Sequence, residues 1–191
     1  MTRIENCKQV TSWARALDAA RQTVGKQPIG KQPSNAWEAK MLLAEHSPIR
    51  LVEYEWLWRD IPYWVVNHLT RHHEGCEKFV MSQRDDRGNA GDRSRADRPQ
   101  GQLIDMRMCC NAQALINISR KRLCAKASPE TRNAWSMVRM SIGFGDPVMA
   151  DKMVRECVYR GFCPEPKSCG YYGTAEYENE RNNYIKTDYG E

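Results

Sequence analysis

The chain of 191 residues has no long run of apolar residues. Its apolar stretches stay well short of the ~20 residues that a membrane-spanning helix needs. The N-terminal segment, MTRIENCKQV, lacks the apolar core of a signal peptide. These two absences predict a soluble, cytoplasmic protein without a membrane partner.

The sequence also lacks any C-x-x-C pair, so neither a zinc ribbon nor a thioredoxin-type site is indicated. We expect its eight cysteines to be reduced thiols, as is usual inside cells. Cys157, Cys163 and Cys169 are evenly spaced near the C-terminus and leave a metal site open as an alternative to ordinary thiols. Free cysteines are often simply buried, so we predict no bound metal.

Neither sign of charge dominates: the chain has 29 lysines and arginines and 24 aspartates and glutamates, which gives a net charge of only +5. The arginines are interleaved with aspartates rather than massed, which favours small anionic ligands over nucleic acid as a partner. A hydrophobic content of 41% with six tryptophans argues against global disorder. The length predicts one domain with a sizeable core.

Alternating apolar and polar residues predict strands over 49–59, 78–81 and 103–109. The first of these strands has a strongly aromatic face, formed by Tyr54, Trp56 and Trp58. Apolar residues at helical spacing predict helices over 11–24, 35–45 and 111–122. Further helices are expected to begin near 61, 128 and 146, and the last of these should extend to Cys157.

Capping residues support several of these helix starts. Asn35 and Glu38 have capping-box spacing, and Asp60 followed by Pro62 is typical of a helix N-terminus. From Cys163 onward the sequence is polar and tyrosine-rich without a period, so we expect irregular structure or partial disorder there. The predicted organisation is a domain over 1–162 and a polar extension over 163–191.

The helix that begins near 61 carries Arg71, His72 and His73 at its C-terminal end, and Ser82-Gln83-Arg84 follows about ten residues on. Arginine supplies planar, bidentate donors, so these groups suit a phosphate or a flavin-like anion. The alternative is that the triplet caps the last carbonyls of the helix.

The segment 85–101 is rich in Gly, Asp and Arg and has no apolar period, which predicts a mobile loop or linker. Its four arginines form either a solvated surface or a lid that closes on an anion: Arg87, Arg93, Arg95 and Arg98. In the helix 111–122, Asn111, Asn117 and Arg122 lie beside the apolar stripe, where they meet a cofactor edge or remain solvated.

These separated motifs occur in one order, and over roughly residues 35–157 the sequence resembles the flavin-dependent thymidylate synthases, the ThyX family. The family signature is Arg-His-Arg at a helix end, a short spacer and Ser-x-Arg. Here Arg71-His72-His73 and Ser82-Gln83-Arg84 take those places, with His46-Ser47-Pro48 upstream. Asn111, Leu115, Asn117 and Arg122 follow at the family's offsets.

The resemblance implies an α/β (α+β) fold with a small, mainly antiparallel sheet packed with helices, in a homotetramer whose active sites combine several subunits. It also implies methylation of dUMP to dTMP. Methylenetetrahydrofolate would donate the carbon, reduced FAD would carry the hydride, and NADPH would reduce the flavin. Segment 85–101 would be an active-site loop.

The resemblance also assigns roles to single residues. The cofactor-binding residues are Ser47, Arg71, His72, His73, Asn111 and Asn117. The nucleotide-binding residues are His68, Ser82, Gln83, Arg84, Arg95 and Arg122. The catalytic residues are Arg71, His72 and Arg122, of which Arg122 would contact the uracil ring and stabilise charge.

The sequence departs from the family at several of these positions. His73 replaces an arginine, Arg50 stands where a glutamate is usual, Gln113 replaces an arginine, and the glutamate of the spacer is missing. These changes leave two alternatives beside dUMP methylation. One is a flavin- and folate-dependent one-carbon modification of another pyrimidine nucleotide, such as hydroxymethylation. The other is a non-catalytic homologue that binds nucleotides or nucleic acid.

Overall fold

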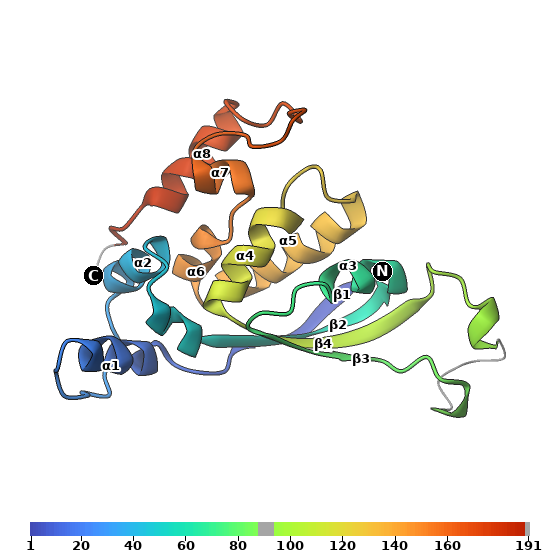
Figure 1. Cartoon of the computed structure of the whole chain (residues 1–191), viewed down its shortest axis with the longest axis horizontal. Coiled ribbons are helices and arrows are strands. Elements are labelled where there is room, and N and C mark those ends of the chain that lie inside the picture. Colours follow the sequence, from blue (N-terminus) through green and yellow to red (C-terminus); the bar gives the residue numbers. More distant parts are fainter. Residues whose placement is uncertain (88–93, 190–191) are drawn as a thin grey trace.

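The computed structural model describes residues 1–87 and 94–189. In this part of the chain a four-stranded antiparallel sheet has the order β1-β2-β4-β3 (Figure 1). Its strands are β1 (Arg3–Gln9), β2 (Glu53–Pro62), β3 (Cys76–Val80) and β4 (Leu103–Asn111). The predicted fold class, a small antiparallel sheet packed with helices, is therefore confirmed.

Residue alternation explains why β2 and β4 form the centre of the sheet. Tyr54, Trp56 and Trp58 of β2 are buried, and their neighbours on β4, such as Met108 opposite Trp56, are buried as well. Burial of such large side chains is the main favourable term in folding, at roughly 25 cal/mol per Å² of apolar surface. The intervening residues of both strands point to the other, partly exposed face of the sheet.

The helices cover one face of the sheet in two layers. In Figure 1, α4 (Ala112–Arg122), α5 (Pro129–Gly143) and α6 (Pro147–Lys152) lie over the sheet, and α7 (Glu156–Arg160) with α8 (Ala175–Ile185) lies above them. Trp135 of α5 meets Trp56 edge-on, with ring centroids 5.9 Å apart, and its indole N–H donates to Ser119 of α4 at 2.9 Å. This contact ties two helices to the sheet.

A buried carboxylate joins the remaining elements of this core. Asp146 accepts hydrogen bonds from Trp13 Nε1 at 2.9 Å, from the Tyr54 hydroxyl at 2.5 Å and from the backbone N–H of Met149 at 2.8 Å. Trp13 begins α1 (Trp13–Thr23), so the network links α1, β2 and α6. Each donor would cost about 1–3 kcal/mol if it were buried without a partner.

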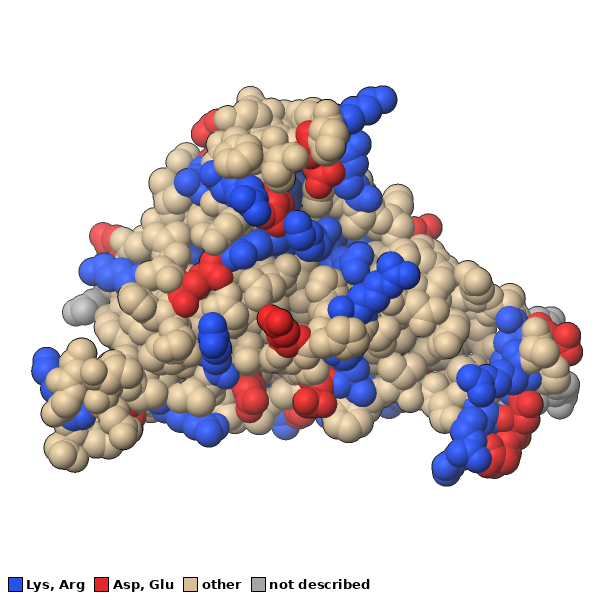
Figure 2. All heavy atoms as spheres, in the orientation of Figure 1, with Lys and Arg blue, Asp and Glu red and all other residues tan. Residues whose placement is uncertain are grey.

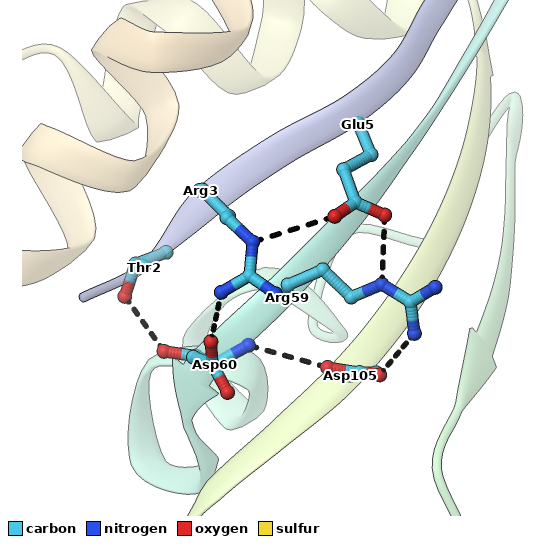
Figure 3. Close-up of polar contacts among 6 residues, drawn as sticks. All are labelled: Thr2, Arg3, Glu5, Arg59, Asp60 and Asp105. Atoms are coloured by element: carbon cyan, nitrogen blue, oxygen red, sulfur yellow. Dashed lines mark hydrogen bonds and ion pairs between the residues drawn. The ribbon is translucent and has the colours of Figure 1, made fainter.

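The opposite face of the sheet carries a network of ion pairs (Figure 3). Arg59 of β2 donates to Glu5 of β1 at 2.9 Å and to Asp105 of β4 at 2.6 Å. Asp105 also accepts the backbone N–H of Asp60 at 3.2 Å, where the β2 register shifts and Asp60 has a φ of +54°. Exposed pairs contribute little singly, but this one spans three strands at a bulge.

Long-range pairing overrides the predicted helix start at Asp60. β2 continues through Ile61 and Pro62, which pair with Ile104 and Leu103 of β4, and α3 (Tyr63–Leu69) begins only afterwards. The predicted cap at Asp60 is therefore wrong. The helix α2 (Asn35–Leu43) is capped by the side chain of Ser34 and not by the predicted Asn35, and a 3₁₀ helix (Ser47–Leu51) replaces the start of the predicted strand.

Two predictions for the C-terminal third are corrected. The single helix expected from Asp146 to Cys157 is divided into α6 and α7 by residues 153–155. The segment from Cys163, which we expected to be irregular, contains α8. The buried face of α8 consists of Tyr177, Glu180 and Tyr184, so it has no apolar period that the sequence could reveal.

Buried charges hold α8 in place. Glu180 pairs with Arg139 at 3.1 Å and with Arg155 at 3.1 Å and accepts the Tyr171 hydroxyl at 2.6 Å. Lys152 is fully buried, and its Nζ donates to the carbonyls of Tyr184 and Lys186, each at 2.6 Å.

The division into a domain over 1–162 and an extension over 163–191 stays a prediction.

The predicted loop 85–101 has two short 3₁₀ turns, Asp85–Arg87 and Arg95–Asp97, while its centre, with Arg93, lies outside the described residues. No helix within 1–87 and 94–189 is both long enough and apolar enough to cross a bilayer.

Candidate functional site

Two adjoining pockets lie beside α4. The first, which we call the α4 pocket, has a volume of about 520 Å³ and is lined by Glu45, Arg50, Glu74, Gly75, Asn111, Gln113, Ala114 and Asn117. The second, which we call the triplet pocket, has a volume of about 310 Å³ and is lined by Arg71, His72, His73, Glu74, Ala114, Asn117 and Ile118. Glu74, Ala114 and Asn117 belong to both linings.

The structure thus brings together five of the six residues predicted to bind cofactor. Arg71, His72 and His73 line the triplet pocket, Asn111 lines the α4 pocket, and Asn117 lines both. Ser47, the sixth, is exposed at the start of the 3₁₀ helix, and neither lining includes it. Their roles as ligands stay predictions.

Asn111 is fixed by its position at the start of α4. Its Oδ1 accepts the backbone N–H of Ala114 at 2.9 Å, so Asn111 is the helix N-cap and its amide nitrogen takes no part in the cap. Gly75 allows this arrangement, because it has a φ of +68° and a Cβ added there would lie 2.6 Å from Asn111 Nδ2. No motif in the sequence marks Gly75.

Glu45 is a second residue that sequence analysis missed. It has a φ of +49°, and its carboxylate accepts hydrogen bonds from Gln113 and Arg120 of α4. Gln113 Nε2 also lies 3.4 Å from Asn117 Oδ1, so the chain of contacts orients the Asn117 amide. The Arg120 guanidinium stacks on the Tyr159 ring of α7, 3.4 Å from its centroid.

His72 is held as a neutral imidazole. Arg122 Nε donates to His72 Nε2 at 2.8 Å, so the ring proton must sit on Nδ1. Burial lowers the pKa of His72 to about 4, and the charges of Arg122, Lys78 and His73 act in the same direction. Lys78 of β3 also donates to the His72 carbonyl and fixes the backbone of the triplet.

Arg122 is itself immobilised. Its Nη2 donates to the carbonyl of His68 at 2.6 Å, so two of its three nitrogens hold groups of the same chain. Burial and then Arg71 lower its pKa. His68 contacts the Thr131 hydroxyl through Nδ1 at 2.9 Å, and burial followed by the charges of Arg122 and Arg71 lowers its pKa. The predicted contacts of His68 and Arg122 with a nucleotide stay predictions.

The Ser82-Gln83-Arg84 motif lies elsewhere, on a segment that projects from the sheet beyond β3 (Figure 1). Figure 2 shows basic and acidic side chains together on this projection. Arg84 pairs with Asp86 through two hydrogen bonds of 2.9 and 2.6 Å, and both side chains are exposed. Ser82 is exposed and accepts the backbone N–H of Arg84 at 3.3 Å.

A third, smaller pocket of about 120 Å³ lies on the same projection. Gln83, Arg95 and Arg98 help to line it. Arg98 has a side chain only 6% exposed and donates to the Gln83 carbonyl at 2.6 Å, whereas the predicted ligand Arg95 is exposed. The burial of Arg98 depends on the fold of the projection, and no local pattern in the sequence distinguishes it from Arg95.

The triplet and the Ser82–Arg84 motif therefore line different pockets of one chain. None of the three pockets described above combines them. The resemblance implies active sites that combine several subunits, so a meeting of the two motifs between chains stays a prediction. Among these same residues, no cluster of three or more His, Cys, Asp or Glu side chains could hold a metal ion, and Cys169 is exposed.

The sequence matches no family model and no curated protein. The fold, in contrast, is similar to that of a UMP/dUMP methylase, PolB from Streptomyces cacaoi, in its crystal structure with 5-Br dUMP. The two chains share 14% identity with a TM-score of 0.64, over 85% of this chain and 96% of that one. The structure of PolB with 5-Br UMP shares 15% identity with this chain at a TM-score of 0.60, over 80% of this chain and 93% of that one. This likeness establishes a shared fold.

We predict that Gly75→Ala destabilises the protein more than Gly25→Ala. Both residues have a positive φ, which costs an alanine about 1–2 kcal/mol, but nothing lies within 4 Å of the added methyl at Gly25. At Gly75 the methyl also displaces the Asn111 cap, which adds about 1 kcal/mol or more. Urea unfolding of both variants measures the difference, and equal losses would show that Asn111 does not depend on Gly75.

We predict that His72 titrates near pH 4, well below its ordinary value of 6.5, in an NMR titration of the imidazole signals. Arg122→Met removes both the donor to Nε2 and a nearby positive charge, so the pKa should rise. Between about pH 6.5 and 4 this histidine is protonated in the unfolded chain but not in the folded protein. Its contribution to the free energy of unfolding therefore decreases as the pH is lowered through this range. An unchanged pKa in the variant would disprove the assigned tautomer.

Proposed function

We propose that this chain is a flavin-dependent pyrimidine-nucleotide methylase that converts dUMP to dTMP, with methylenetetrahydrofolate as the carbon donor and NADPH as the reductant of the flavin. The observation that carries the proposal is the placement of the triplet and of Asn111 and Asn117 around two adjoining pockets. Support also comes from the fold, which is shared with a protein described as a UMP/dUMP methylase.

The residues around the pockets fit FAD. The α4 pocket, at about 520 Å³, lies in the size range of cofactor sites, and its walls carry the amides of Asn111, Gln113 and Asn117. Such amides suit the carbonyl and N–H groups along the edge of a flavin ring. Arg50 and Arg71 supply exposed positive charges at the two pockets. Bound, reduced FAD would supply the hydride.

The chain's own groups would bind and polarise the substrate. Neutral His72 carries its proton on Nδ1 and can donate it in a hydrogen bond without adding a full charge. Arg122 is held rigidly by His72 and His68, so its charge is preorganised to stabilise negative charge that develops on a uracil ring. Arg71 is exposed and free to meet an anionic group at the triplet pocket.

The nucleotide phosphate would be held by Ser82, Gln83, Arg84 and Arg95 of the projecting segment. Because none of the three pockets described above joins the described part of that segment to the triplet, we propose that it completes the site of a second copy in a homotetramer. The pairing of Arg84 with Asp86 would then be exchanged for a stronger contact with a dianionic phosphate.

A second candidate is a flavin- and folate-dependent modification of another pyrimidine nucleotide. The PolB structures contain analogues of both dUMP and UMP. His73 and Gln113, which replace family arginines, line the two pockets and reduce their fixed positive charge. Either change would alter the choice of nucleotide or of one-carbon group.

We predict that the protein binds FAD, develops the visible flavin spectrum, and forms dTMP from dUMP, methylenetetrahydrofolate and NADPH. Arg122→Met should lower turnover by roughly 100-fold or more, because it removes a charge aimed at the transition state. Arg132→Met, a change of a partly buried arginine on α5 that lines neither pocket, is the matched control and should leave turnover unchanged.

Mass spectrometry of the products with dUMP, UMP and dCMP tested in parallel separates the candidates. Thymidylate as the sole product supports the first, and a hydroxymethylated product or a preference for another nucleotide supports the second. A colourless protein that takes up no FAD and turns over none of the three nucleotides would refute both.

We predict that two inactive variants complement each other in mixed oligomers. Asn117→Ala damages the triplet pocket and Arg84→Ala damages the projecting segment, so an intact site forms where the undamaged halves of two chains meet. Co-expression should restore part of the activity that each variant lacks. Asn117→Ala mixed with His72→Ala is the control without recovery, because both lie in one pocket. No recovery in the first mixture would refute a site shared between two chains.

A further inference from the structure

Two cysteines lie opposite each other on the neighbouring strands β3 and β4. Cys76 is the register partner of Cys110. The backbone N–H of Asn111 donates to the Gly75 carbonyl at 2.9 Å, and that of Met81 donates to the Asp105 carbonyl at 2.9 Å. Hydrogen-bonded pairs alternate along an antiparallel ladder, so the pair Cys76–Cys110 falls at a position without such bonds.

This position brings the two thiols within bonding range. In pairs without backbone hydrogen bonds the Cα atoms are about 4.5 Å apart and the side chains approach more closely. A disulfide accepts Cα separations of roughly 4.4–6.8 Å. Both side chains point to the helix-covered face, where Cys76 is 7% and Cys110 1% exposed. We propose that Cys76 and Cys110 are a site of reversible oxidation, at which a hydroperoxide converts the two thiols into a disulfide.

The surroundings make the two sulfurs chemically unequal. A hydrogen bond from the Cys110 thiol lowers the pKa of Cys76 against the effect of burial, and the charge of Lys78 acts in the same direction as that bond. Burial and then the contact with Cys76 raise the pKa of Cys110 well above its ordinary value. Cys76 is therefore the attacking thiolate and Cys110 the resolving thiol.

The reaction balances with one hydroperoxide per pair. The Cys76 thiolate attacks the O–O bond, which breaks to give a sulfenic acid on Cys76 and an alcohol or water that takes up the proton. The Cys110 thiol then attacks the sulfenic sulfur, the S–S bond forms, and water leaves with the hydroxyl. Two thiols are oxidised by two electrons, and the peroxide is reduced by two; a dithiol reductant reverses the change by exchange.

Cys109 is the neighbouring thiol that the geometry excludes. It points to the opposite face of the sheet, where its register partner is Glu77, and burial followed by Glu53 and Glu55 raises its pKa. An attack on Cys109 would have to cross the sheet. The selectivity for Cys110 over its chain neighbour is thus a direct consequence of strand alternation.

The cysteine pair adjoins two residues of the α4 pocket. Gly75 precedes Cys76 and Asn111 follows Cys110, and both line the α4 pocket. The bridge would join the two strands next to one wall of this pocket. The inference concerns the thiols alone and stands whether or not the proposed function is correct.

Treatment of the full-length protein with hydrogen peroxide, followed by alkylation and mass spectrometry, tests the proposal. We expect two of the eight cysteines to escape alkylation, with the loss of two hydrogen masses. Trypsin should release the peptides 72–78 and 108–120 joined by a disulfide, and fragmentation should place the bridge at Cys110 rather than Cys109. Dithiothreitol should restore both thiols.

Cys109→Ser is the matched control and should keep the bridge, whereas Cys110→Ala should lose it. The wild-type peptide map decides the question even if Cys110→Ala fails to fold. A bridge through Cys109, over-oxidation of Cys76 without a bridge, or eight alkylated cysteines after treatment would each overturn the proposal.

Discussion

The pairing of β2 with β4 is the interaction on which the rest of the molecule depends. It buries Trp56, Trp58 and Met108 beneath α5, and each strand leads directly into a helix of the candidate site. β2 runs into α3 and the triplet, while β4 runs into α4 with Asn111 at its cap. The positions of the two groups around the pockets are thus set by one strand register, and a slip by one residue would turn the tryptophans outward.

Around the pockets, charged side chains hold other groups of the same chain in place. Arg122 and Lys78 fix the ring and the carbonyl of His72, and Glu45 fixes Gln113 and Arg120. Such contacts keep donors and acceptors in place before a ligand arrives, which lowers the reorganisation needed on binding. The exposed Arg50 and Arg71 remain available for an anion.

Local patterns were enough to predict much of the fold. The alternation through Tyr54, Trp56 and Trp58 located β2, and apolar residues at helical spacing located α1 and α5. The errors arose where distant residues decide. Pro62 stays in the sheet because it pairs with Leu103, and α8 folds because its buried Glu180 finds arginines on other elements.

The candidate site shows the same division between local and distant information. The family resemblance assigned the triplet, Asn111 and Asn117 to one cofactor site. In the structure these residues line two adjoining pockets. Three residues could not be predicted from the sequence: Glu45, Gly75 and Lys78. Each acts through a contact with a residue that is distant in sequence or lies across a turn. No periodicity or motif encodes such contacts.

The burial of Lys152 changes how the polar tail should be regarded. Its ammonium group reaches the last carbonyls of α8 and the Tyr189 hydroxyl, 3.3 Å away, so these late residues solvate a charge inside the protein. Removing only the last turn of α8 and the residues after it would strand that charge in apolar surroundings. A polar stretch without an apolar period thus becomes part of the interior, because it supplies the acceptors for a buried ammonium group.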